Sequence, residues 1–144
     1  MNAVELYNWT PALRVMAMGL LLALGPVCWV WLRHRQSDVA GRRRALVLLT
    51  LFLTFDLVLF GAFTRLTDSG LGCPDWPGCY GSASPLGARD EIRVEQAARP
   101  DGPVTHGKAW VEMVHRYLAS GVGLLLIVLA AWNWRAARQS TRIG

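Results

Sequence analysis

The sequence has few charged side chains and few of the motifs that mark soluble enzymes. Charged residues make up 17% of the chain, below the roughly 25% that is usual in soluble domains. Its histidines and cysteines do not have the spacing of a zinc site, and it contains neither a glycine-rich phosphate loop nor a nucleophile elbow. Internal repeats and low-complexity tracts are also absent. These absences argue against the common zinc, nucleotide and hydrolase sites.

Long apolar runs are what the sequence has instead, and 53% of its 144 residues are hydrophobic. Three apolar runs are predicted to be transmembrane helices, at about residues 15–32, 45–63 and 112–134. Each is near the roughly 20 residues that a helix needs to cross about 30 Å of hydrocarbon. The first run could be a cleavable signal peptide, but Trp29 and Trp31 are bulky where a cleavage site needs small residues. We therefore expect an all-α integral membrane protein, a single domain over 1–144 that forms a partial helical bundle.

Charge predicts how these helices are oriented. The segment between the first two runs and the tail after the third are rich in arginine, with Arg33, Arg35, Arg42, Arg43, Arg44, Arg135, Arg138 and Arg142. Short segments of this kind stay in the cytoplasm. The loop at about 66–110 has six acidic and four basic residues, as expected for a loop on the outer side of the membrane. We expect a bacterial inner-membrane protein with a periplasmic amino terminus and loop and a cytoplasmic carboxyl terminus. The formal charge of +5 then reflects orientation, and no nucleic acid partner is expected.

The predicted outer loop contains two of the three cysteines. Cys73 and Cys79 lie in a turn-rich segment, on the side of the membrane where disulfides persist. Their spacing leaves open whether they form a structural disulfide or a thiol pair that exchanges electrons. Cys28 lies in the first apolar run and is expected to be a packing residue. Later in the loop, residues 88–98 could form a short helix.

The third apolar run begins with residues that could bind a cofactor. Glu112 and His115 are three residues apart and share a helix face. Ala119 and Gly123 follow His115 at steps of four, and their small side chains leave room for a flat macrocycle, as axial haem ligation requires. Glu112 could orient such a ligand or handle protons near it. The same spacing also suits a helix-packing face of small residues, with His115 and Arg116 as interfacial polar side chains.

Asp56 lies near the middle of the second apolar run. A carboxylate at that depth costs on the order of 3 kcal/mol, so we expect it to face protein and to be paired or protonated. A polar contact between helices, with Thr54 or a group on another helix, and a role in a proton path or a site contact remain alternatives. His106, in the loop, is expected to be solvated, and a role as a second ligand is the alternative.

Two segments carry a resemblance to a known family. They are GAFTRLTDSGLGCPDWPGCYG at Gly61–Gly81 and HGKAWVEMVHRYLASG at His106–Gly121. In order, spacing and topology they resemble the haem A synthase family, membrane enzymes that serve cytochrome oxidase assembly, and the similarity covers about 45–130. The resemblance implies a protein of two four-helix halves that oxidises a methyl group of haem O to the formyl group of haem A. It implies three site features: His115 as an axial ligand of the haem iron, Glu112 as a catalytic carboxylate, and Cys73 with Cys79 as the outer-loop cysteine pair.

The sequence also departs from the family pattern. The helix with the partner histidine of the first half and the second half with its haem b site have no counterpart here, and the first apolar run looks like an addition. We therefore expect an amino-terminal part of the enzyme. Its expected partners are membrane lipid, haem O and the missing carboxyl-terminal half, a haem O supplier or a homo-oligomer. The alternatives are a non-catalytic membrane haem-binding module and a thiol-redox membrane protein.

Overall fold

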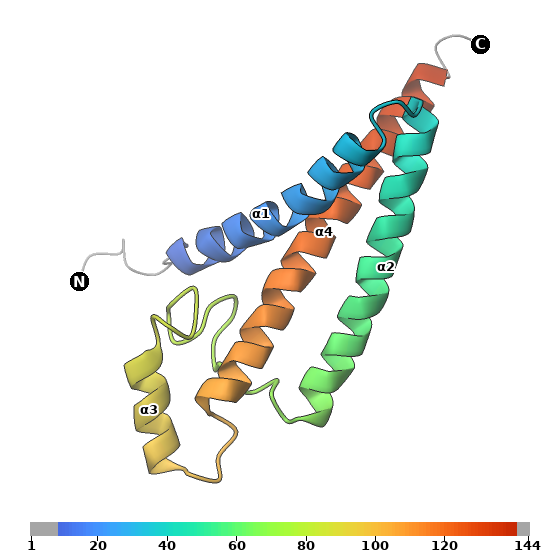
Figure 1. The fold of residues 1–144 in the computed structure, drawn as a ribbon. Coiled ribbons are helices and arrows are strands. Elements are labelled where there is room, and N and C mark those ends of the chain that lie inside the picture. The colour runs from blue at the N-terminus through green and yellow to red at the C-terminus, as the bar shows by residue number, and fades with distance from the viewer. Residues whose placement is uncertain (1–8, 141–144) are drawn as a thin grey trace, which may run out of the picture.

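The computed structural model describes residues 9–140, which form four α-helices (Figure 1). They are α1 (Thr10–Arg33), α2 (Val39–Leu66), α3 (Arg89–Ala98) and α4 (His106–Ser140). By length and composition, α1, α2 and α4 can each cross a membrane. The predicted all-α membrane fold with three long apolar helices is therefore confirmed, and so is the short helix expected near 88–98.

Each long helix begins before the apolar run that predicted it. α1 begins at Thr10, α2 at Val39 and α4 at His106. The apolar run marks only the part that suits hydrocarbon, whereas helical hydrogen bonding continues into polar residues wherever the end is capped. At the start of α2, for example, the Asp38 carboxylate accepts a hydrogen bond of 2.8 Å from the backbone N–H of Gly41.

The central helix is α4, which packs most extensively against α1 and next against α2 (Figure 1). The connection between α1 and α2 lies at one end of the molecule, together with the last turns of α4. The segment 67–105, including α3, lies at the opposite end. The arginine-rich segments are therefore at the same end, away from the loop with the excess of acidic residues.

The buried apolar residues form two separate clusters. The first, called the helix core, joins the three long helices through Ala23, Val30, Leu46, Leu125 and Leu129. The second, called the loop core, joins the start of α4 to the 67–105 segment and to α1 through Val15, Cys73, Cys79, Ala88, Ile92, Val104, Ala109, Met113 and Tyr117. The loop is therefore packed onto the end of the bundle instead of extending away from it.

Small residues bring α1 and α4 into close contact. A Cβ atom added to Gly19 would lie 2.7 Å from the Cβ of Ser120, and one added to Gly121 would lie 3.1 Å from the Cβ of Leu22. Such contacts are how helices associate in lipid, where the hydrophobic effect gives little attraction between them. The prediction that Cys28 is a packing residue is wrong, because Cys28 is exposed on α1.

Candidate functional site

His115 lies on α4 opposite the last part of α2. The facing residue is Gly61, and a Cβ atom added there would lie 2.9 Å from Nε2 of His115. The ring of Phe60, also on α2, has its centroid 6.0 Å from that of the imidazole, and the two rings are tilted by 33°. The absence of a side chain at Gly61 therefore makes room for the imidazole between the two helices.

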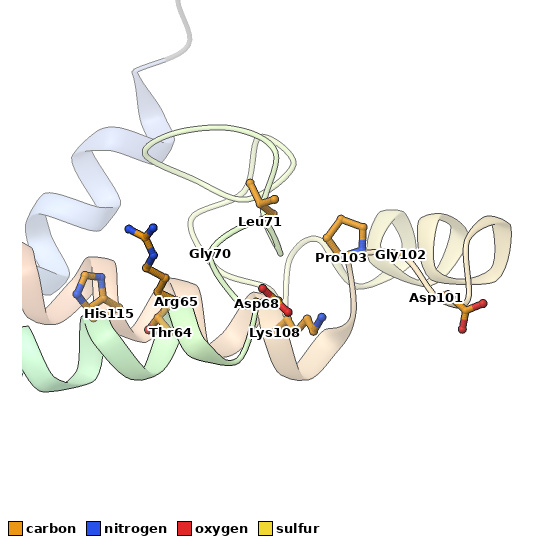
Figure 2. Close-up of a pocket in the computed structure, with 11 residues that line it drawn as sticks. Thr64, Arg65, Asp68, Gly70, Leu71, Asp101, Gly102, Pro103, Lys108 and His115 are labelled. Carbon is orange, nitrogen blue, oxygen red and sulfur yellow. The ribbon is translucent and has the colours of Figure 1, made fainter.

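Two cavities border His115. The larger, called the outer cavity, has a volume of about 640 Å³ and lies between the ends of α2 and α4 beside the loop, where Arg65 and Lys108 help to line it (Figure 2). The smaller, of about 380 Å³, lies on the side of α1 and is lined in part by Trp76 and Ala119. Both volumes are within the roughly 300–1,000 Å³ of typical small-molecule and cofactor sites. His115 can therefore face a ligand in either cavity.

Ala119 and Gly123, the small residues that follow His115 along α4, differ from each other in their surroundings. Ala119 lines the smaller cavity together with His115. A Cβ atom added to Gly123 would meet nothing within 4 Å, so Gly123 does not lie in a close helix contact among the described residues. The close contact with α1 uses Ser120 and Gly121 instead. The alternative interpretation of Ala119 and Gly123 as a helix-packing face is therefore not what this structure shows.

Glu112 is buried, with 7% of its surface exposed, and its carboxylate has two partners. One oxygen, Oε2, accepts a hydrogen bond of 2.9 Å from the backbone N–H of Cys73. The other, Oε1, accepts a hydrogen bond from the Arg116 guanidinium in a buried ion pair. The carboxylate expected to serve His115 is thus directed toward Arg116 and the cysteine loop.

Arg116 was suggested by the sequence only as an interfacial polar side chain, and its place in this site was not predicted. Its guanidinium also donates hydrogen bonds to the carbonyl oxygens of Asp75, at 2.7 Å, and Gly78, at 2.6 Å. The pair with Glu112 could have been found in the sequence, because an acid four residues before a base is a favourable helix spacing. The two carbonyl contacts depend on the folded loop. Together, Glu112 and Arg116 attach the cysteine loop to α4 on the turns around His115.

Cys73 and Cys79 form a disulfide, with their Cα atoms 4.8 Å apart. The two residues are 5% and 0% exposed and belong to the loop core. Thiol–disulfide exchange requires a thiolate to reach one of the sulfur atoms, and this burial prevents that approach. Of the two alternatives, the structure therefore supports the structural disulfide.

The turn after the second cysteine is held by Asp75. Its carboxylate accepts hydrogen bonds from the backbone N–H groups of Tyr80 and Gly81, the latter at 2.8 Å. Both of these residues have positive φ angles, 49° and 71°. Burial, and then the Glu95 and Asp75 carboxylates, raise the pKa of the Tyr80 phenol above its ordinary value of 10.0. The phenol therefore stays neutral at physiological pH.

Asp56 lines an apolar groove of about 490 Å³ between α1, α2 and α4. The side chain is exposed, and among residues 9–140 it has no hydrogen bond or ion pair. The suggested contact with Thr54 is wrong, because the Thr54 hydroxyl donates to the backbone carbonyl of Thr50 at 2.8 Å. The carboxylate thus faces a space that the described residues leave open.

His106 is the first residue of α4. Its Nε2 atom is buried and has no hydrogen-bond partner within residues 9–140. The expectation of a solvated side chain is therefore wrong for this nitrogen atom. The ring does not line either cavity beside His115, so the described structure gives it no place in the candidate site.

The fold and the site define a membrane protein in which long apolar helices carry a disulfide-bonded polar loop beside a histidine that borders two cavities. A family model described as cytochrome oxidase assembly protein matches residues 44–144. The chain belongs to this family, the haem A synthase family that the two motifs resemble. The match includes α2, the loop and α4, and it leaves α1 outside.

Several curated relatives are described as haem A synthases. The protein of Shewanella oneidensis is 49% identical over 87 residues, which are 60% of this chain and 26% of that protein. The protein of Sinorhizobium medicae is 32% identical over 111 residues, which are 69% of this chain and 30% of that protein. The protein of Agrobacterium fabrum is 30% identical over 135 residues, which are 85% of this chain and 37% of that protein. The chain thus spans about a third of the length of these relatives. No solved structure matches it.

Proposed function

We propose that this chain is the amino-terminal part of a haem A synthase, in which His115 ligates the iron of haem O during oxidation of a methyl group to the formyl group of haem A. The observation that carries the proposal is the position of His115, opposite Gly61 and between two cavities, within the segment that matches the family. When bound, haem supplies the redox chemistry, and the protein supplies ligation and orientation.

The residues around His115 fit a haem better than a bare metal ion. Within residues 9–140, no three His, Cys, Asp or Glu side chains come together as a metal site. A single imidazole suits an iron whose equatorial ligands come from a macrocycle. Gly61 places no side chain in front of Nε2 of His115, and Ala119 lines the smaller cavity beside the imidazole. A second axial ligand would come from the missing helices or from a second copy of the chain.

Glu112 is assigned a positioning role in this proposal. Its two carboxylate oxygens are used by Arg116 and by the backbone of Cys73, so a proton-handling role would require one of these contacts to break. By holding the loop on α4, the carboxylate keeps Trp76 and Pro77 against the smaller cavity beside His115. The catalytic role implied by the family resemblance remains a prediction for Glu112.

The proposed orientation puts the loop and α3 in the periplasm of a bacterium and the arginine-rich end in the cytoplasm. The start of α2, which contains Arg42 and Arg43, supports it, because it lies at the end of the bundle opposite the loop (Figure 1). The Cys73–Cys79 disulfide supports it as well, since disulfides persist in the periplasm. The amino terminus is then periplasmic, and the carboxyl terminus is cytoplasmic.

A non-catalytic haem-binding module is the second candidate, because the same His115 site would serve it. The type of haem separates the two functions. An enzyme part should hold haem O or haem A, whereas a general carrier should hold whichever haem is abundant. A thiol-redox function is not supported, because both cysteines are buried in a disulfide.

A haem assay on the purified chain tests the proposal. The chain, His115→Ala and the control His34→Ala are purified in mild detergent and compared by pyridine haemochrome spectra. Each is also co-expressed with the remaining three quarters of the Shewanella relative, which would supply the missing helices. We expect haem in the unchanged chain and in His34→Ala, and its loss in His115→Ala. Equal haem content and unchanged spectra in His115→Ala would contradict the proposal. Where haem is bound, chromatography of the extracted haem identifies its type and so distinguishes a part of the enzyme from a general carrier.

A further inference from the structure

The outer cavity carries two cationic side chains beside His115. Arg65 comes from the last turn of α2 and Lys108 from the first turn of α4, and both line the cavity (Figure 2). Arg65 is exposed and Lys108 is half-buried. Neither takes part in an ion pair among residues 9–140. Two cations are therefore available to an anionic group that enters this cavity.

Acidic side chains line the same cavity but leave these cations unpaired. Asp68 and Asp101 are both exposed at its wall. Neither comes within ion-pair distance of Arg65 or Lys108 in the described structure. Apart from His115, the remaining lining residues have no ionisable side chain. The cations and the imidazole are thus the groups that could select a ligand with both a metal and carboxylates.

The smaller cavity offers no such pair of cations. Its one charged lining residue is Arg116, and the guanidinium of Arg116 already donates to Glu112, Asp75 and Gly78. A carboxylate entering there would have to displace those partners. Of the two cavities that border His115, the outer one therefore suits an anionic ligand.

We propose that Arg65 and Lys108 bind the propionate carboxylates of haem in the outer cavity while His115 faces its iron. This inference rests on the proposed function. A guanidinium can bind a carboxylate through two parallel hydrogen bonds, whereas an ammonium acts as a compact charge. Arg65 and Lys108 would hold the propionates at the loop end and would thereby restrict rotation of the porphyrin beside His115. Because a porphyrin carries more than one methyl group, this anchoring decides which one is presented for oxidation.

The test compares porphyrins that differ only in their carboxylates or in their metal. The probes are iron protoporphyrin IX, its dimethyl ester and metal-free protoporphyrin IX, titrated into the purified full chain in lipid nanodiscs. We expect the free acid to bind about tenfold more tightly than the ester, as for charge-assisted hydrogen bonds to partly exposed cations. Arg65→Gln/Lys108→Gln should abolish that preference and leave the affinity for the ester unchanged. The control Arg89→Gln/Arg93→Gln removes the same charge from α3 and should keep the preference.

His115→Ala separates this inference from the proposed function. It should weaken binding of both iron porphyrins and leave metal-free protoporphyrin IX unaffected, whereas the double variant should weaken the metal-free acid as well. If iron porphyrins depend on His115 but the free acid and the ester bind equally, the propionate assignment is overturned and the haem proposal stands. If the double variant keeps the preference, the assignment is likewise overturned. Iron porphyrin spectra that are the same with and without His115, or no binding of any probe, would overturn both.

Discussion

The loop core and the helix core differ in the contacts that hold them together. In the loop core a disulfide and the hydrogen bonds of Glu112 and Arg116 join segments that are far apart in the sequence. In the helix core aliphatic side chains meet, and α1 and α4 touch near Gly19 and Gly121. Polar and covalent links suit a segment exposed to water, whereas close packing of small residues suits helices in lipid.

Both regions leave large apolar side chains exposed. Those on α2 include Leu51, Phe52, Phe55 and Val58. The loop segment buries its cysteines and Ile92 almost completely but exposes Leu71, Trp76, Leu86 and Val94. Both regions therefore leave apolar surface that lipid or further helices could cover. This agrees with a chain that spans about a third of its relatives.

Removing the Arg116 side chain should have the largest effect, because it should destabilise the loop core. In Arg116→Ala the Glu112 carboxylate stays buried without its cation, and two loop carbonyls lose their donor. We expect a loss of about 3 kcal/mol in the free energy of unfolding, measured by thermal unfolding in mild detergent together with protease resistance of the loop. The control Arg93→Ala removes only an exposed ion pair with Asp90 and should cost less than about 0.5 kcal/mol. Similar losses in both variants would show that the buried pair does not hold the loop.

Removing the disulfide should have the next largest effect. Cys73→Ser/Cys79→Ser should destabilise the protein by about 2 kcal/mol, because the unfolded chain gains entropy when the short loop is no longer closed by the disulfide. Reductant that is present during unfolding, when the sulfur atoms become accessible, should lower the unfolding midpoint of the unchanged chain and leave that of the double variant unaffected. Cys28→Ser is the control, since Cys28 is exposed and unbonded. An unshifted midpoint in the double variant would contradict the importance of this bond.

Gly19→Ala should destabilise the packing of α1 against α4 in the helix bundle. Its Cβ would lie 2.7 Å from Ser120, so α1 must move away from α4, at a cost of about 1–2 kcal/mol. At Gly25, on the same helix, an added Cβ meets nothing within 4 Å, and Gly25→Ala should be neutral or slightly stabilising. Thermal unfolding of the two variants checks this difference. Protease resistance of the loop should be unchanged in both, and a loss in Gly19→Ala would show that the two cores are coupled.

Gly61→Ala should have the smallest effect on stability. The added methyl group would contact the end of the His115 side chain, which can rotate, so the free energy of unfolding should change by less than about 1 kcal/mol. The imidazole would nevertheless be displaced, and haem affinity should fall about tenfold, as for the loss of one favourable contact. Spectroscopic titration with haem measures this, with Gly107→Ala as the control because it has open space around it. Equal haem affinity in the two variants would show that Gly61 does not position His115.

Composition and local spacing were enough to predict the helices and the loop with its two cysteines, but they left open whether Cys73 and Cys79 form a disulfide. They were not enough to predict the direction of Glu112, because both His115 and Arg116 lie within one helical turn of it. The choice depends on Cys73, which is 39 residues away in the sequence. The packing face of α4 was similarly ambiguous. Ala119 and Ser120 are neighbours separated by about 100° around the helix axis, and only the position of α1 shows that Ser120 makes the contact.

The length of α4 has a consequence for how a ligand reaches His115. Its 35 residues span about 52 Å at 1.5 Å per residue, whereas hydrocarbon is only about 30 Å thick. Some turns at each end must therefore stand among lipid headgroups or in water. His115 lies about 14 Å from the first residue of the helix, near the level where α4 enters the bilayer. Under the proposed function, a lipid-soluble porphyrin could thus reach His115 by lateral diffusion within one leaflet, without passing through water.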